Sequence, residues 1–152
     1  MKAVLTYGTF DLLHVGHVNI LERLKERGDR LVVGISSDEF TRLKGKQSVH
    51  SYAECARIVG ARRYVDLVIP EHDWSQKRND VQEHLINVFG IGEDWRGKFD
   101  KLSNTCEVVY LPRTDSISST NLKNSLSRID GDLINKIKHN SDSVLNLVKA
   151  LE

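Results

Sequence analysis

The sequence is poor in the residues that define several protein classes. Among its 152 residues there are only two cysteines, Cys55 and Cys106, which lie far apart and lack the spacing of metal ligands. Such cysteines are typical of reduced thiols in a cytosolic protein. No apolar run approaches the roughly 20 residues of a membrane-spanning helix, and the apolar stretch after Met1 is too short for a secretory signal. We therefore expect a cytoplasmic protein without membrane insertion.

A surplus of charge of one sign is also missing. The 22 basic and 21 acidic residues give a net charge of +1, and the most basic stretches, 42–46 and 62–63, are short and separated. Nucleic-acid-binding proteins usually carry a basic face or stripe. The charge pattern therefore indicates no nucleic-acid partner.

What the sequence does contain is a series of short apolar runs rich in Val and Ile. Runs that are apolar on both faces are typical of strands buried in a parallel sheet. Five such strands are predicted, at 3–7, 31–35, 65–69, 88–91 and 108–111. Segments of helical period separate them, which favours one α/β domain with a doubly wound, mostly parallel, Rossmann-like sheet. In such sheets ligands bind beyond the carboxyl ends of the strands, where the strand order reverses.

Helices are predicted between these strands from apolar spacing and capping residues, at about 18–28, 51–59, 75–87 and 118–127. The second opens with the capping-box spacing of Ser51 and Glu54, and the last starts in a cap rich in Ser and Thr. We assign residues 1–129 to the α/β domain and 130–152 to a helical C-terminal extension of the same domain. One or two amphipathic helices are predicted there, which favours a role in packing or oligomer contact. The prediction depends on the spacing of the apolar residues Leu133, Ile134, Ile137, Val144, Leu145, Leu147, Val148 and Leu151.

The segment after the first strand carries the pattern with the clearest chemistry. Gly8-Thr9-Phe10-Asp11 is followed two residues later by His14-Val15-Gly16-His17. A glycine turn that opens a helix can hold phosphate on backbone N–H groups, and Gly16 lets the backbone approach a ligand. His14 and His17 face the same side of a first helical turn, so both imidazoles can donate to a triphosphate. The alternatives are a capping or packing role, or a zinc site, for which complementary ligands are not evident.

This motif resembles the signature of the HxGH nucleotidyltransferase superfamily. Further segments appear in order along residues 1–126, and together they resemble the bacterial glycerol-3-phosphate cytidylyltransferases: Lys44–Lys46, Arg63–Asp66, Val68–Glu71, Gly92–Phe99, Leu111–Thr114 and Ser118–Thr120. The resemblance implies condensation of CTP with sn-glycerol 3-phosphate to CDP-glycerol and pyrophosphate, with Mg²⁺ on the triphosphate. It also implies a homodimer and a place in teichoic-acid or capsule biosynthesis.

The resemblance further implies residue roles. Four residues are expected to be catalytic: His14, His17, Lys46 and Arg113. The nucleotide is expected to contact these residues and also Thr9, Phe10, Asp11, Gly16, Arg63, Asp94, Trp95, Thr114, Ser118, Ser119 and Thr120. Lys44 and Lys77 are expected to bind the acceptor phosphate, and no dedicated metal site on the protein is expected.

Three of these assignments leave alternatives open. Asp11 is either a magnesium or ribose contact or the residue that closes the turn, and Trp95 contacts the ligand or belongs to the core. Arg63 and Asp66 either form an ion pair at a subunit contact or line the base pocket.

The chain also departs from the family pattern. Cys55 stands where an arginine is usual, which leaves acceptor identity more open than the use of CTP. The alternative functions are a cytidylyltransferase for another phosphorylated polyol or amino alcohol, an adenylyltransferase of the same fold, and a non-catalytic nucleotide-binding regulator.

Overall fold

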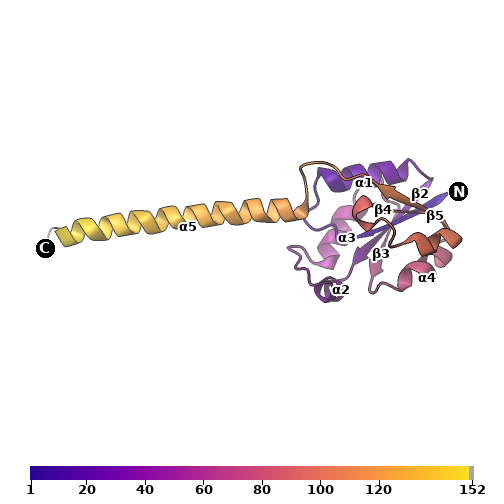
Figure 1. Ribbon diagram of the computed structural model, residues 1–152, viewed down its shortest axis with the longest axis horizontal. Helices are drawn as coiled ribbons and strands as arrows, with labels where there is room; N and C mark the ends of the chain where they lie inside the picture. Colours follow the sequence, from indigo (N-terminus) through magenta and orange to yellow (C-terminus); the bar gives the residue numbers. More distant parts are fainter. Residues whose placement is uncertain (151–152) are drawn as a thin grey trace. The chain divides into compact units, whose positions relative to one another are not determined.

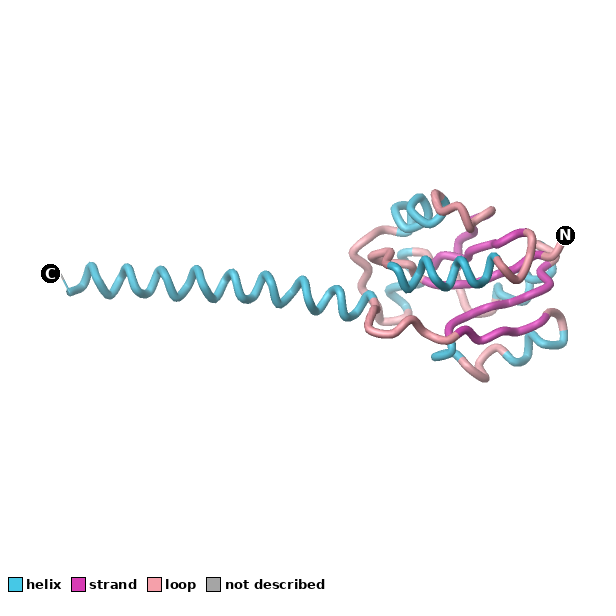
Figure 2. Tube along the Cα trace, turned by 90° about the horizontal axis from the view of Figure 1, so that it is seen from above, coloured by secondary structure: helices cyan, strands magenta, loops and turns pink. Residues whose placement is uncertain are grey.

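The computed structural model describes residues 1–150, in which five strands form one parallel sheet (Figures 1 and 2). The strand order is β3-β2-β1-β4-β5, and every pair of neighbours runs parallel. The strands are β1 (Ala3–Gly8), β2 (Arg30–Ser36), β3 (Leu67–Glu71), β4 (Ile86–Gly92) and β5 (Glu107–Leu111). The predicted α/β fold class is confirmed.

The strand order reverses beside β1. The chain moves outward from β1 through β2 to β3, then crosses back to place β4 on the other side of β1 and β5 beyond it. Ligands bind outside the carboxyl ends of the strands at such a reversal. The turn that follows Gly8 therefore lies where the fold favours a binding site.

Helices cover both faces of the sheet (Figure 1). The four helices of the sheet unit are α1 (Val15–Lys25), α2 (Asp38–Leu43), α3 (Tyr52–Gly60) and α4 (Gln76–Glu83), with short 3-10 turns η1 (Glu93–Trp95) and η2 (Asp100–Asn104). Leu21, Leu24 and Val59 from α1 and α3 pack with Val4, Leu31 and other side chains of one sheet face. Val81 from α4 and Leu102 from η2 pack with Leu5 and Phe89 on the opposite face.

Local signals explain most helix ends. The predicted capping box at α3 is present, with Ser51 Oγ accepting from Glu54 N and Glu54 Oε2 accepting from Ser51 N at 2.8 Å. The helix predicted at 75–87 was too long, because Leu85 adopts a positive φ of 53° and Ile86 already begins β4. The sequence analysis missed α2, which has only 6 residues and depends on Ser37 accepting from Phe40 N.

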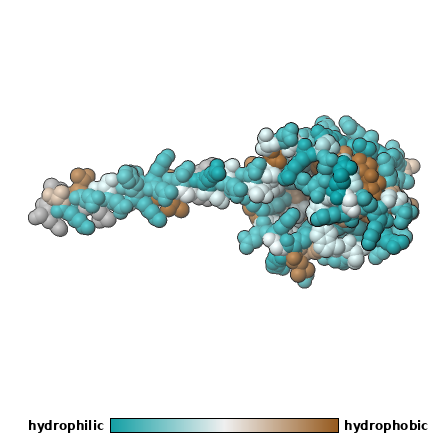
Figure 3. Space-filling model, in the orientation of Figure 1, coloured by the Kyte–Doolittle hydropathy of each residue, from teal (hydrophilic) through white to brown (hydrophobic). Residues whose placement is uncertain are grey.

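The chain divides into two compact units, residues 1–117 and the segment from Ser118 onward, and each is described by itself. The second unit is the helix α5 (Ser119–Ala150), a continuous helix of 32 residues. The predicted boundary between 129 and 130 falls inside it. Apolar side chains interrupt its mostly hydrophilic surface (Figure 3), and the described exposed ones of the predicted pattern are Leu133, Ile134, Ile137, Val144, Leu147 and Val148. Leu151 and the side chain of Leu145 lie outside the described part.

None of the helices within residues 1–150 is both long and apolar enough to cross a membrane.

Candidate active site

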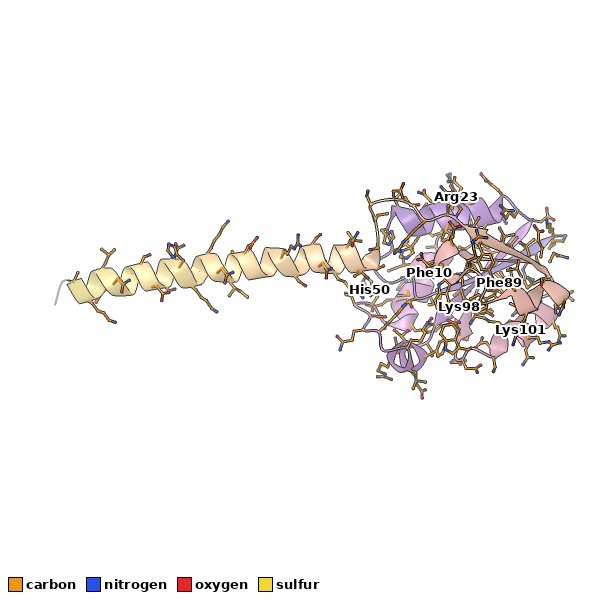
Figure 4. All side chains as sticks on the ribbon, viewed as in Figure 1. Phe10, Arg23, His50, Phe89, Lys98 and Lys101 are labelled. Atoms are coloured by element: carbon orange, nitrogen blue, oxygen red, sulfur yellow. The ribbon has the colours of Figure 1, made fainter. Side chains whose placement is uncertain are left out.

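The turn after β1 is built around a buried phenylalanine. Phe10 and Leu12 adopt the left-handed region, with φ of 53° and 49°, which folds the chain back over the end of the strand. The Phe10 side chain is only 6% exposed and lies inside the sheet unit (Figure 4), where its ring packs 5.3 Å from that of His17. A β-carbon at Gly8 would lie 2.8 Å from the Phe10 ring. Because the Phe10 side chain is buried, a ligand at the turn after β1 can contact Thr9 and the backbone of the turn.

His14 and His17 form a capping box at the start of α1. His14 Nδ1 accepts from Gly16 N at 3.1 Å, and His17 Nδ1 accepts from His14 N at 3.3 Å. The two rings are stacked, with centroids 3.9 Å apart. A neutral imidazole whose Nδ1 accepts a hydrogen bond carries its proton on Nε2. Each ring therefore presents an Nε2–H donor, as a phosphate-binding role requires.

The protonation of both rings follows from their surroundings. Burial and, to a smaller extent, the neighbouring His14 lower the pKa of His17 to about 4, against an opposing effect of Asp11. Burial also lowers the pKa of His14, and the guanidinium of Arg113 adds to this effect. Both imidazoles are therefore neutral donors at pH 7.

Gly16 is needed for this arrangement. A β-carbon at position 16 would lie 2.9 Å from His14 Cε1 and 3.0 Å from His14 Nδ1. The glycine therefore makes room for the imidazole that caps the helix. The sequence analysis had explained it by the approach of a ligand to the backbone.

Asp11 connects the turn to the loop that carries Lys46. Its carboxylate is buried and accepts from Val49 N and His50 N, each at 2.9 Å. This geometry supports the structural alternative for Asp11, because both carboxylate oxygens bind loop backbone. The side chain of Lys46 is exposed on that loop.

The segments after β4 and β5 meet beside the first turn of α1. Arg113 Nη1 lies 3.1 Å from Asp94 Oδ2, and both side chains are largely exposed. Asn19 of α1 donates to Thr114 Oγ1 at 3.1 Å, which ties the chain after β5 to α1. Arg113 is close enough to His14 to affect its pKa. These residues thus join the histidines at the carboxyl end of the sheet.

A second charged cluster lies at the ends of β2 and β3. The Glu71 carboxylate accepts from Lys77 Nζ and from Ser36 Oγ, and lies 3.7 Å from Lys44 Nζ. Lys44 Nζ also donates to Ser36 Oγ at 2.7 Å. Ser36 and Glu71 are register partners in the sheet, which brings these groups together. The structure therefore places the two predicted acceptor lysines on one carboxylate.

Aromatic rings surround this cluster. Lys44 Nζ lies 4.5 Å from the centroid of Phe40, and Lys77 Nζ lies 4.8 Å from that of Trp74. The Trp95 ring packs 5.5 Å from Trp74 and is partly exposed, so it contributes to this wall while also packing against the core cluster of one sheet face. A cavity of about 430 Å³ opens beside it, lined by Phe40, Leu43, Lys44, Lys46, His72, Asp73, Trp74 and Trp95.

Arg63 is not part of this constellation. Asp66 precedes β3 and accepts from Leu31 N at 2.7 Å, so the segment lies at the amino ends of the strands, opposite the site. The alternative ion pair also differs from the prediction, because Asp66 pairs with Lys25 at 2.6 Å and Arg63 donates to Tyr64 Oη. Within one chain the structure therefore does not bring Arg63 together with the other predicted nucleotide contacts, and its assignment to nucleotide binding stays a prediction.

The remaining predicted residues belong to the second unit. Ser118 Oγ accepts from Asn121 N at 3.0 Å, as predicted for a helix cap, and Ser119 and Thr120 begin α5. The nucleotide contacts of Ser118, Ser119 and Thr120 stay predictions.

Cys55 lies in the core rather than at the acceptor cluster. It is 2% exposed and packs in the cluster that contains Phe10 and Val59. Burial, together with the carboxylates of Asp11 and Asp38, raises the pKa of its thiol to about 11. An arginine here would enter a buried site beside two carboxylates. The cysteine at position 55 therefore affects the packing of the core more directly than the binding of the acceptor.

The sequence analysis missed Glu71, Trp74 and Asn19 as site residues. Glu71 had a usable signal, because it closely follows the strand predicted at 65–69, on the side where ligands bind. Asn19 and Trp74 gave no such signal, since their positions depend on tertiary packing.

Comparisons with known proteins agree with this geometry. Residues 5–125 match the cytidylyltransferase-like family model. The glycerol-3-phosphate cytidylyltransferase of Bacillus subtilis (strain 168) is 56% identical over 127 residues, which cover 84% of this chain and 98% of that protein. The protein of the same name from Staphylococcus aureus (strain NCTC 8325 / PS 47) is 50% identical over 126 residues, covering 83% and 96%.

A solved structure shares the fold. The lipopolysaccharide core biosynthesis protein of Thermoplasma volcanium GSS1 superimposes with a TM-score of 0.67 at 28% identity, covering 76% of this chain and 99% of that one. Fold and site thus define a nucleotidyltransferase-like protein. The chain belongs to the cytidylyltransferase-like family, and within it to the glycerol-3-phosphate cytidylyltransferases.

Proposed function

We propose that the protein is a glycerol-3-phosphate cytidylyltransferase that converts CTP and sn-glycerol 3-phosphate to CDP-glycerol and pyrophosphate. An oxygen of the acceptor phosphate forms a bond to the α-phosphorus of CTP, while the bond from that phosphorus to the bridging oxygen of pyrophosphate breaks. The observation that carries this proposal is the stacked pair of neutral histidines at the end of β1. The 56% identity to the Bacillus subtilis protein supports the choice of substrates.

The residues at the site suit a reaction without a protein nucleophile or base. The second pKa of a phosphomonoester is about 6, so the acceptor is largely ionised at pH 7. Positioning and neutralisation of negative charge then supply most of the rate. In the proposal His14 and His17 donate Nε2–H groups to the phosphates, and Lys46 and Arg113 add positive charge.

Mg²⁺ is proposed to enter the site on the CTP triphosphate and to neutralise part of its charge. The side chains of the site are mainly cations and N–H donors, which suit phosphate oxygens better than a metal ion. Asp11 binds loop backbone and Asp94 pairs with Arg113. The donor set thus fits a metal held by the nucleotide.

The acceptor phosphate is proposed to bind Lys44 and Lys77. The cluster of two lysines and one carboxylate carries a net positive charge. Lys44 lines the 430 Å³ cavity, Lys77 lines a second cavity of about 560 Å³, and Trp74 lines both. A small polyol phosphate matches such a site in charge. Thr9, Phe10, Asp94, Trp95 and Thr114 are proposed to line the nucleotide side.

We also propose that the protein acts as a homodimer in the cytoplasm and supplies CDP-glycerol to teichoic-acid or capsule synthesis. The similarity to the two glycerol-3-phosphate cytidylyltransferases supports these proposals.

The decisive experiment measures pyrophosphate release with each of the four nucleoside triphosphates against a panel of phosphomonoesters. We expect CTP with glycerol 3-phosphate to give the highest kcat/KM. A polyol or amino-alcohol phosphate that exceeds glycerol 3-phosphate about tenfold would overturn the acceptor, and equal turnover with ATP would overturn the nucleotide. Binding of CTP without turnover of any acceptor would indicate a regulator.

A further inference from the structure

Glu71 is a buried charged residue to which the mechanism above gives no role. It is the last residue of β3, at the carboxyl edge of the sheet, and only 2% of it is exposed. Burying a carboxylate is costly unless the group is paired and hydrogen-bonded. What Glu71 is paired with therefore indicates why it is there.

Its two oxygens divide their contacts between the two lysines. Oε1 accepts from Lys77 Nζ, while Oε2 accepts from Ser36 Oγ at 2.7 Å and lies 3.7 Å from Lys44 Nζ. The Ser36 hydroxyl also accepts from Lys44 Nζ at 2.7 Å, so it forms a hydrogen-bonded bridge between the same carboxylate and the second lysine. One carboxylate thus fixes the position of both ammonium groups.

The other neighbours of the lysines are mainly aromatic faces. Lys77 Nζ lies 4.4 Å from the centroid of Tyr7 and 4.8 Å from that of Trp74, and Lys44 Nζ lies 4.5 Å from that of Phe40. Such faces attract a cation without fixing the direction of its N–H bonds. The carboxylate and the hydroxyl relay supply that direction.

We propose that Glu71 is a positioning residue of the acceptor site, whose carboxylate orients the ammonium groups of Lys44 and Lys77 toward the acceptor phosphate. This inference rests on the proposed function, in which these lysines bind that phosphate. Two ammonium groups and one carboxylate leave one positive charge, which a phosphate dianion then meets in a partly buried site.

Glu71 also raises the pKa of Lys44 and so favours its charged form. Burial lowers the pKa of Lys44, and Lys46 and Lys77 lower it further, whereas Glu71 raises it. Without the carboxylate the pKa of Lys44 falls, so its charge is lost at a lower pH. The charged and titratable groups around the cluster come from every neighbouring element: Lys44 and Lys46 after α2, Lys77 and Asp80 in α4, Tyr7 in β1, and Asp73 after β3.

The test is Glu71→Gln in the full-length chain, with pyrophosphate release measured against each substrate in turn. We expect the KM for glycerol 3-phosphate to rise about tenfold or more, since two charge-assisted contacts lose their partner. The KM for CTP should change by less than about twofold, and the alkaline limb of kcat/KM for the acceptor should move to lower pH. Glu83→Gln, at an exposed position at the end of α4, is the matched control.

A second variant separates positioning from folding. Glu71→Asp keeps the charge but withdraws the carboxylate by one methylene, so the KM for the acceptor should rise while the alkaline limb stays in place. If Glu71→Gln does not fold, a wild-type acceptor KM in Glu71→Asp overturns the proposal. A folded Glu71→Gln with wild-type acceptor KM, or with equal increases in both KM values, also overturns it. Failure of the wild-type protein to use glycerol 3-phosphate contradicts the proposed function instead, and is measured separately.

Discussion

At the scale of single residues, the histidine pair combines structure with chemistry. A capping box usually pairs Ser or Thr with Glu or Gln, whose oxygens satisfy the first N–H groups of the helix. Here the Nδ1 atoms of His14 and His17 do this, which leaves both Nε2 atoms for a ligand. The backbone contacts thereby set the tautomer of both rings.

We expect His14→Ala and His17→Ala each to lower kcat by about 10² or more, because each removes a donor to the developing charge. The KM for CTP should change much less. Steady-state kinetics of the purified variants check this, with His139→Ala on exposed α5 as the control. Near-wild-type kcat in both folded variants would contradict the assignment.

The lowered pKa of His17 also predicts how stability depends on pH. The group titrates near 6.5 when unfolded and near 4 when folded, so the unfolded state takes up the proton first as the pH falls. Above pH 6.5 His17 is neutral in both states and costs no stability. As the pH falls from 6.5 to about 4, the free energy of unfolding decreases by about 3 kcal/mol at most because of this group. Denaturant unfolding should show a flatter pH dependence in His17→Asn, but not in His139→Asn.

At the scale of elements, the site depends on one loop being held against one turn. Asp11 accepts from the backbone of Val49 and His50, and so holds the loop that carries Lys46 against the turn after β1. The loop also contains Gly45, whose φ of 70° suits glycine. The position of Lys46 is therefore set by a carboxylate in a different element.

We expect Asp11→Asn to raise the KM for CTP severalfold and to lower the free energy of unfolding by about 1–3 kcal/mol, because one amide nitrogen replaces an acceptor. The Mg²⁺ concentration that gives half-maximal rate should not change. A shift of that midpoint by about tenfold, measured by Mg²⁺ titration at saturating CTP, would show that Asp11 holds the metal.

The helices and strands also show how much of the structure could be predicted from the sequence. Buried parallel strands leave continuous apolar runs, so all five were found, and the capping box at Ser51 marked the start of α3. The position of Arg63 at the amino ends of the strands was not evident, because a motif gives the order of residues along the chain and not the edge of the sheet they reach. Glu71 was missed because its pairing with two lysines exists only once β2 and β3 are in register.

At the scale of the whole molecule, the site takes residues from the carboxyl ends of all five strands. The turn after β1, Ser36 in β2, Glu71 in β3, Asp94 after β4 and Arg113 after β5 all belong to that edge. The sheet unit, residues 1–117, therefore supplies both charged clusters.

The long helix α5 extends beyond the region shared with the Bacillus subtilis protein. The match to the Bacillus subtilis protein covers 98% of that protein but only 84% of this chain. We therefore expect a chain ended after Ile129 to keep kcat/KM within about twofold of the full-length value, since the contacts of the proposed site lie before it. Kinetics and light scattering of the truncated protein check this. A large loss of activity, or a change from dimer to monomer, would assign the extension a role in the enzyme.

Because of the histidine capping box, a substitution that inactivates the enzyme is also expected to speed degradation of the protein in the cell. A substitution that removes either ring also removes a hydrogen bond from the first turn of α1, at a cost of about 1 kcal/mol. Small losses of this size raise the unfolded fraction severalfold, and unfolded chains are removed by proteases. Copies that lose the reaction are thus also expected to have shorter lifetimes, so selection against inactive variants begins with their degradation.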